Sequence, residues 1–184
     1  MPMYPYRSAR IFILLICLLA FAKTQAQEFA VYDSLPQLIS RIQEAGNSTL
    51  VLNFWATWCK PCVEELPCFE ELRKQYADKN VKVLLVSLDF KSQLEKKFIP
   101  FLRAQQLKSD VVLFADQDAN AWIPYIHEEW DGAIPVTLVI KGKIKAISHG
   151  KFEEYTDLEN FVLPYIGDAA NISLKNLVNC NNGK

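Results

Sequence analysis

Residues 50–67 read LVLNFWATWCKPCVEELP, and this stretch decides the fold. It opens with a continuous apolar run in which Asn53 is the single polar side chain, a pattern typical of a central strand covered on both faces. A helix is expected to follow over residues 60–78, with a proline in its first turn, where a missing N–H costs nothing. Cys59 and Cys62 fall at the junction of the two elements, which indicates a reactive pair of thiols rather than a packed one.

The position of Cys59 favours its thiolate, which is the form of cysteine that attacks a disulfide. A helix N-terminus carries about half a positive charge and free N–H groups, and Lys60 adds a cation beside it. Cys62 lies one helical turn further on, close enough to close a disulfide with Cys59. We therefore expect Cys59 to attack first and Cys62 to act as the resolving thiol that releases the partner. The intervening Lys60-Pro61 dipeptide is expected to tune the reduction potential of the pair.

The rest of the chain alternates between strand-like and helix-like patterns. Strands are expected at residues 28–32, 49–56, 81–88, 111–114, 134–140 and 144–149. Helices are expected at residues 35–46, 60–78, 92–106, 120–127 and 153–166. Alternation in the first half predicts a parallel sheet sandwiched by helices, and the closing hairpin adds an antiparallel edge. In such α/β folds the chemistry lies at the carboxyl end of a central strand, which is where Cys59 stands.

The first 26 residues have the order and size of a secretory signal peptide. Arg7 and Arg10 precede an apolar run of 12 residues, Ile11–Ala22. This run is shorter than the roughly 20 residues that a membrane-spanning helix needs, and an uncleaved N-terminal anchor remains the alternative. The expected organisation is a signal peptide at 1–26, one domain at 27–168 and a polar tail at 169–184.

The charge of the chain argues against a nucleic-acid partner. The 184 residues have a net charge of −1, and removal of the expected signal peptide leaves 17 basic against 21 acidic residues, a net charge of −4. The sequence has no Lys/Arg stripe with interleaved aromatic residues, so the electrostatic footprint of a nucleic-acid-binding protein is missing.

Export would place the chain in an oxidising compartment, where cysteines form disulfides. Four cysteines follow the leader, and the C-x-x-C spacing of two of them favours a redox motif over a disulfide framework. Cys68 falls on the opposite side of the helix from Cys59 and is expected to be a small, partly buried residue. A disulfide between Cys68 and Cys180 is the alternative. Neither His127 nor His149 has the spacing of a metal ligand, so no metal site is expected.

The motif FWATWCKPC, the later Pro67 and the segment Ile134-Pro135-Val136-Thr137 resemble the thioredoxin fold. The leader, the segment between about 91 and 127 and the pattern LNFWATWC…EELP are more similar to the secreted TlpA/ResA-like thioredoxins than to cytosolic thioredoxin. The resemblance is strong over 49–68 and good over 133–140. Elsewhere it is topological, and it is absent from the C-terminal tail. It implies an α/β, thioredoxin-like fold in which helices flank a central mixed β-sheet and an insertion precedes the cis-proline strand.

The resemblance also implies roles for individual residues. Pro135 would be the cis-proline opposite the cysteines, and Ile134 would offer its backbone to a bound partner segment. Trp58 would cap the site and contact the substrate. The buried aspartate of cytosolic thioredoxin is replaced by Asn53, which cannot carry a proton. Glu65 matches an acidic position that the ResA-like branch uses near its cysteines, and it would transfer protons to or from the second cysteine; a solvated helix Glu is the alternative.

The function that the resemblance implies is that of an exported, periplasmic or extracytoplasmic thiol–disulfide oxidoreductase that needs no cofactor. Its partners would be exported proteins with disulfides or dithiols, and a membrane-bound electron donor would recharge it as a reductase. A disulfide oxidase or isomerase would use the same residues. A peroxidase and a non-catalytic interaction module on a thioredoxin scaffold are the further alternatives.

Overall fold

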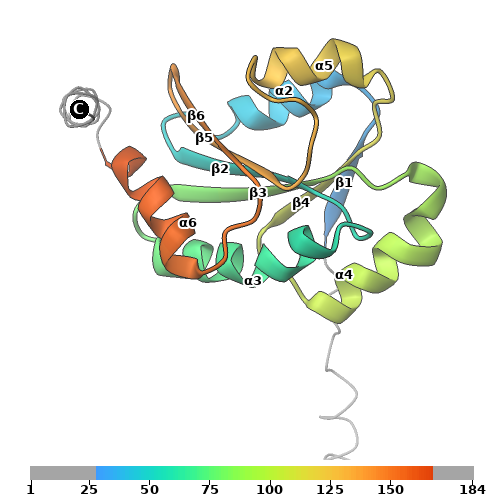
Figure 1. Cartoon of the computed structure of the whole chain (residues 1–184), viewed down its shortest axis with the longest axis horizontal. Helices are drawn as coiled ribbons and strands as arrows, with labels where there is room; N and C mark the ends of the chain where they lie inside the picture. Colours follow the sequence, from blue (N-terminus) through green and yellow to red (C-terminus); the bar gives the residue numbers. More distant parts are fainter. Residues whose placement is uncertain (1–27, 168–184) are drawn as a thin grey trace, which may run out of the picture.

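Six strands form one mixed β-sheet in the computed structural model, which describes residues 28–167 (Figure 1). The strands are β1 (Phe29–Tyr32), β2 (Thr49–Trp55), β3 (Val81–Ser87), β4 (Asp110–Phe114), β5 (Val136–Lys141) and β6 (Ile144–His149). Their order across the sheet is β1-β4-β3-β2-β5-β6. The first four of these run parallel, β5 is antiparallel to β2, and β6 is antiparallel to β5. The parallel half and the antiparallel edge predicted from the sequence are both present.

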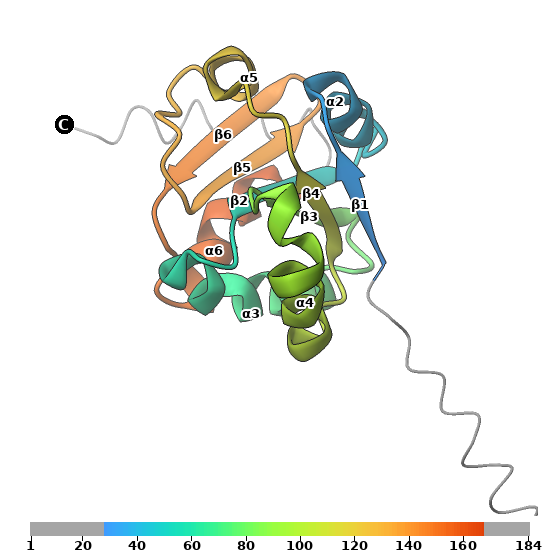
Figure 2. The same cartoon turned by 90° about the vertical axis from the view of Figure 1, so that its right-hand side faces the viewer.

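Helices cover both faces of this sheet. The α-helices are α2 (Leu35–Gln43), α3 (Lys60–Gln75), α4 (Ile99–Gln105), α5 (Ala119–Ile126) and α6 (Tyr155–Val162). Three short helical stretches are not α-helical. Two are 3-10 helices, η1 (Lys91–Gln93) and η3 (Leu163–Tyr165), and one is a π-helix, η2 (Leu94–Phe98). Figures 1 and 2 show α3, α4 and α6 on one face of the sheet and α2 and α5 on the other.

Successive side chains of β2 point to opposite faces and enter two separate cores. Val51 and Trp55 pack with the buried side of α3, whereas Leu52 and Phe54 pack with α2 and α5. All seven residues of β2 are buried, as predicted for a strand covered on both faces. Asn53 stands between Val51 and Trp55 in the alternation, so its side chain lies on the face covered by α3.

Two of the predicted helices are less regular than expected. The segment predicted as one helix over 92–106 consists of parts of η1, then η2 and α4. Pro100 accounts for the division, because it has no N–H to donate and fits only in the first turn of a new helix. The predicted final helix over 153–166 is α6 followed by η3, and Pro164 lies in that last turn.

The predicted signal peptide at 1–26 and the polar tail at 169–184 lie outside the described residues and stay predictions. Among residues 28–167, no helix has both the length and the apolar character that crossing a membrane requires.

Candidate active site

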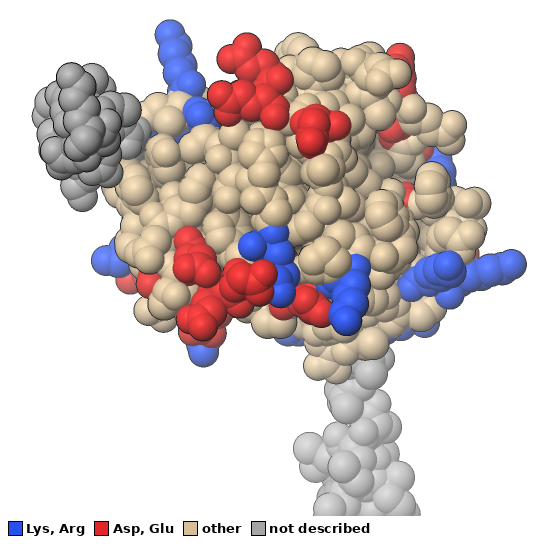
Figure 3. Space-filling model, viewed as in Figure 1, with Lys and Arg blue, Asp and Glu red and all other residues tan. Residues whose placement is uncertain are grey.

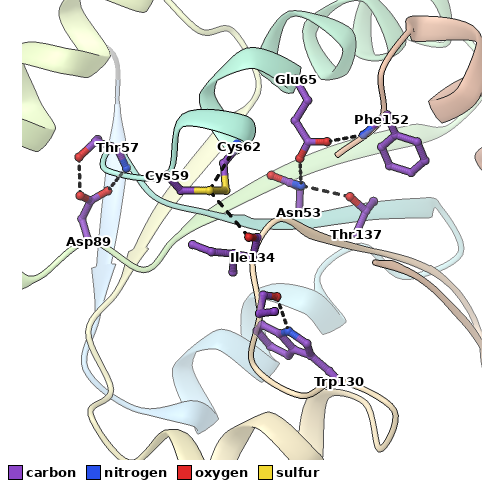
Figure 4. Close-up of a disulfide and its surroundings, with 11 residues drawn as sticks. Asn53, Thr57, Cys59, Cys62, Glu65, Asp89, Trp130, Ile134, Thr137 and Phe152 are labelled. Atoms are coloured by element: carbon purple, nitrogen blue, oxygen red, sulfur yellow. Dashed lines mark hydrogen bonds between the residues drawn. A yellow bond between two sulfur atoms is a disulfide. The ribbon is translucent and has the colours of Figure 1, made fainter. Parts of the chain in front are cut away.

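Cys59 and Cys62 form a disulfide at the N-terminus of α3, with an S–S distance of 2.02 Å (Figure 4). Cys59 is the N-cap residue of the helix, and its Sγ accepts a hydrogen bond from the N–H of Cys62 at 3.4 Å. Pro61 lies in the first turn between them. Cys59 is 7% exposed, whereas Cys62 is 0% exposed. Cys59 is therefore the more exposed of the two cysteines.

The backbone of Ile134 faces this disulfide from the end of β5. Its carbonyl oxygen lies 3.9 Å from Sγ of Cys59, and the Ile134–Pro135 peptide bond is cis (Figure 4). The pairing of β5 with β2 and with β6 begins only at Val136, so Ile134 lies just beyond the ladder. The next residue, Pro135, is held by the segment after β6: its carbonyl accepts a hydrogen bond from the N–H of Gly150 at 2.9 Å.

Glu65 is a buried acid beside the inner cysteine. It is 1% exposed and follows Cys62 by three positions, on the same face of α3. Its Oε1 accepts a hydrogen bond from Nδ2 of Asn53 at 2.9 Å, and its Oε2 accepts one from the N–H of Phe152 at 3.0 Å (Figure 4). Burial raises the pKa of Glu65 to about 7, although both hydrogen bonds and the charge of Lys151 act in the opposite direction. The alternative of a solvated helix Glu is therefore wrong.

Asn53 connects Glu65 to the neighbouring strand. Its Nδ2 also donates to Oγ1 of Thr137 at 3.1 Å, and Thr137 lies directly opposite Asn53 in the β2–β5 ladder. Within residues 28–167, Oδ1 of Asn53 has no hydrogen-bond partner. The amide thus has one unused acceptor next to an acid that titrates near neutral pH.

A second buried carboxylate, Asp89, holds the loop that leads to Cys59, and the sequence analysis did not identify it. Its two oxygens accept hydrogen bonds from the N–H of Thr57 at 2.9 Å, from Oγ1 of Thr57 at 2.5 Å and from Oγ of Ser87 at 2.7 Å. Asp89 is 2% exposed. Its signal in the sequence was an acid directly after the apolar run of β3, at the edge where parallel strands end.

The remaining predicted site residues lie around the disulfide at different depths. Trp58 is 59% exposed beside Cys59, whereas Trp55 is buried and packs against rings of the α4 region. Lys60 points into solvent, with 88% of its side chain exposed, and its Nζ lies 3.8 Å from a carboxylate oxygen of Glu64. The structure therefore brings the cysteines, Glu65 and Ile134 together and leaves Lys60 at the surface.

Cys68 does not join the site. It is half-buried on α3 with a free thiol, and burial raises the pKa of that thiol. Cys180 lies outside the described residues, so their pairing stays untested. In the part of the chain between residues 28 and 167, no group of three His, Cys, Asp or Glu side chains is arranged to hold a metal ion. Nδ1 of His127 accepts a hydrogen bond from the N–H of Glu129 at 3.3 Å.

Charged side chains of opposite sign lie next to one another over α3 and α6 (Figure 3). Lys151, in the loop before α6, lies 3.1 Å from Glu64 and 2.8 Å from Glu153. This pairing ties the loop to α3 close to the point where Phe152 donates to Glu65.

Comparisons with known proteins agree with this geometry. A family model described as the AhpC/TSA family matches residues 22–147. The thioredoxin-like protein YneN of Bacillus subtilis is 37% identical over 89 residues, which are 48% of this chain and 51% of that protein. The thiol-disulfide oxidoreductase ResA of Oceanobacillus iheyensis is 30% identical over 122 residues, which are 65% of this chain and 59% of that protein. The chain thus spans little more than half the length of these relatives.

Among solved structures, a thiol:disulfide interchange protein of the thioredoxin family from Chlorobium tepidum is 22% identical, with a TM-score of 0.55. The match covers 67% of this chain and 83% of that one. This likeness shows that the fold is thioredoxin-like, with a mixed sheet flanked by helices.

Proposed function

This chain belongs to the AhpC/TSA family, and from that premise we propose that it is a thiol–disulfide oxidoreductase that exchanges disulfides with other proteins. One observation supports this above the others. Cys59 at a helix N-terminus forms a disulfide with the less exposed Cys62, and both the Ile134 backbone and a buried acid lie beside the pair. The relative named ResA is a thiol-disulfide oxidoreductase by name, in agreement with the proposal.

In the reducing direction, the thiolate of Cys59 attacks one sulfur of a partner disulfide. A bond forms between Cys59 and that sulfur, the partner's S–S bond breaks, and the second partner sulfur leaves as a thiolate that takes up a proton. The thiolate of Cys62 then attacks Sγ of Cys59 and forms the disulfide seen in the structure. The bond between Cys59 and the partner breaks, and the partner sulfur leaves as a thiolate that takes up a proton. The partner leaves as a dithiol that has gained two electrons, and this chain has lost them. No cofactor is needed because the sulfurs of Cys59 and Cys62 supply both electrons.

Glu65 is the group that accepts the proton of Cys62 before the second attack. It lies on the same helical face, and its raised pKa of about 7 suits both the uptake and the release of a proton at neutral pH. When Glu65 is protonated, its hydroxyl needs an acceptor, and a half-turn of the Asn53 amide supplies the unused Oδ1. Thr137 tolerates this turn because its hydroxyl can donate as well as accept.

The partner binds next to Cys59 along the unpaired backbone of Ile134, where a short extended segment can add hydrogen bonds to the edge of the ladder. Trp58, exposed and directly before Cys59 in the chain, provides an apolar contact for the same segment. The Lys60-Pro61 dipeptide between the cysteines tunes the reduction potential.

The compartment and the direction of electron flow are also part of the proposal. Residues 1–26 direct export to a periplasmic or other extracytoplasmic space, either as a cleaved signal or as an uncleaved anchor. The partners are then exported proteins with disulfides, and a membrane-bound electron donor returns the Cys59–Cys62 disulfide to its reduced form. An oxidase or isomerase would use the same site with the electrons flowing the other way.

The activity is tested with single cysteine variants of the full chain. Cys59→Ser is expected to abolish the reduction of insulin disulfides, because no thiolate remains that a partner can reach. Cys62→Ser is expected to accumulate a mixed disulfide between Cys59 and its partner, detectable on non-reducing gels. Cys68→Ser is the matched control and keeps wild-type activity. Equal rates for Cys59→Ser and the wild type would rule out disulfide exchange at this site.

The direction is tested by the equilibrium reduction potential of the Cys59–Cys62 pair against glutathione. A value near that of thioredoxin, about −270 mV, supports a reductase, whereas a value near about −120 mV identifies an oxidant.

A further inference from the structure

Trp130 connects the strand that leads to Cys59 with the segment that faces it. Its ring is 3% exposed and packs on Phe54 of β2, with ring centroids 4.5 Å apart. Its indole Nε1–H donates to the backbone carbonyl of Ala133 at 2.8 Å. Ala133 directly precedes Ile134, whose carbonyl lies 3.9 Å from Sγ of Cys59, and Figure 4 shows Trp130 beneath this segment.

The backbone of Ala133 is held from both sides. Its carbonyl accepts from Trp130, and its N–H donates to Oδ1 of Asp131 at 2.9 Å. Gly132 between them has a φ of 91°, and a Cβ there would come within 3.0 Å of Ile123 on α5. A non-glycine residue would therefore be strained at this φ, and the end of the Ile123 side chain would have to shift. Together with the hydrogen bond from Gly150 to Pro135, these contacts hold the residues on both sides of Ile134.

We propose that Trp130 is a positioning residue for protein partners. Its indole N–H fixes the carbonyl of Ala133 and thereby holds the Ile134 backbone in the position in which a partner segment can pair with it beside Cys59. The inference rests on the proposed function, because it concerns how that partner is bound. A small disulfide needs only Sγ of Cys59, whereas an extended polypeptide also needs the Ile134 backbone in register. Loss of the indole N–H should therefore affect the two kinds of substrate unequally.

The chain provides a matched control in the same aromatic cluster. Trp122 is 4% exposed, its ring lies 5.4 Å from that of Trp130, and its Nε1–H donates to the backbone carbonyl of Asp116 at 3.1 Å. Trp122→Phe thus removes an equally buried indole donor, one that holds the loop between β4 and α5. Trp130→Phe removes the donor that holds Ala133.

The experiment compares the two variants with wild type in the reduction of insulin and of a small aromatic disulfide, 5,5′-dithiobis(2-nitrobenzoate). Trp130→Phe is expected to raise KM for insulin about fivefold, the effect of losing about one net hydrogen bond, with kcat within about twofold. Its rate with the small disulfide and all constants of Trp122→Phe are expected to stay within about twofold of wild type.

Equal KM values for insulin in Trp130→Phe and Trp122→Phe would overturn the inference, as would an equal loss with both substrates. Asp131→Ala, an exposed change that removes the acceptor for the Ala133 N–H, is expected to raise KM in the same selective way and guards against misfolding of the tryptophan variant. A wild-type chain that reduces neither substrate would instead contradict the proposed function itself.

Discussion

Glu65 keeps its proton at a pH where a solvated carboxyl group has lost it. The side chain is buried with two amide donors and takes part in no ion pair among residues 28–167. Burial raises its pKa from 4.5 to about 7, so the folded protein binds this proton more tightly than the unfolded chain does. The stabilisation from the protonated form is complete below about pH 4.5 and is lost as the pH rises through about 7.

Glu65→Gln removes this titration. Between pH 4.5 and about 7, the free energy of unfolding of the wild type is expected to fall by about 3 kcal/mol relative to the variant, since each pH unit is worth about 1.36 kcal/mol. Urea unfolding of the oxidised proteins at intervals from about pH 4 to 8 measures the difference. Glu95→Gln, an exposed change, should follow the wild type. Parallel curves for the wild type and Glu65→Gln would show that the acid titrates as in solvent.

The roles of single residues were predictable from the sequence only where a local motif carries them. Cys59 and Cys62 were predictable as the reactive pair from their spacing at a strand-to-helix junction. Glu65 remained undecided because its donors, Asn53 and Phe152, are 12 and 87 residues away along the chain. Burial of this kind depends on tertiary packing, which no window of the sequence contains.

Two loops at the carboxyl ends of β2 and β3 are joined through Asp89. The carboxylate takes three hydrogen bonds, two of them from Thr57, and the N–H of Leu88 donates to the carbonyl of Trp55 at 2.8 Å. These bonds place the residues immediately before Cys59. The start of α3 is therefore held by the residues after β3 as well as by β2, the strand that leads into it.

Asp89→Ala is expected to lower the free energy of unfolding by about 2–3 kcal/mol, because the buried donors of Thr57 and Ser87 lose their acceptor. Asp89→Asn is expected to recover more than half of this loss, since hydroxyl groups can turn to accept from an amide. Urea unfolding at pH 7 measures both, with Asp78→Ala, an exposed change, expected within about 0.5 kcal/mol of wild type. A loss in Asp89→Ala no larger than in this control would mean that the loop does not depend on the carboxylate.

The succession of strands and helices was predictable from apolar periodicity, except where the same spacing of apolar residues fits both an α-helix and a π-helix. The spacing of Leu94, Phe98 and Phe101 fits a helix, but it does not separate a π-helical stretch from an α-helix. Only Pro100 marked a discontinuity, and the structure begins α4 at the residue before it. The apolar pattern does not record the type of hydrogen bond within a helix, so the π-helical stretch could not be predicted from it.

At the scale of the whole molecule, residues 28–167 contain the candidate site. The sheet, both cores and every partner of Cys59, Glu65 and Ile134 described above belong to this range. We expect the chemistry to depend on this range and the leader to serve in export.

This separation is tested by expressing the full chain and a chain of residues 27–184 in a bacterium that has a periplasm. The full chain is expected in the periplasmic fraction and the shorter one in the cytoplasm, because an apolar leader after basic residues directs export. Both are expected to reduce insulin at the same rate after purification. Cytoplasmic full chain would contradict export, membrane-bound full chain would identify an anchor, and an unfolded shorter chain would contradict the domain boundary.

The antiparallel pairing of β2 with β5 couples the loss of the site on unfolding to the loss of the sheet. This pairing runs from Leu50 opposite Ile140 to Phe54 opposite Val136. Cys59 and Ile134 extend from adjacent ends of these two strands, so the gap between them widens only if the ladder itself opens. Central ladders open with nearly the free energy of complete unfolding, whereas frayed edges open at little cost. Amide protons in the middle of β2 should therefore exchange with solvent only through global unfolding. On heating, disulfide exchange should persist almost unchanged and then fail abruptly, together with the fold.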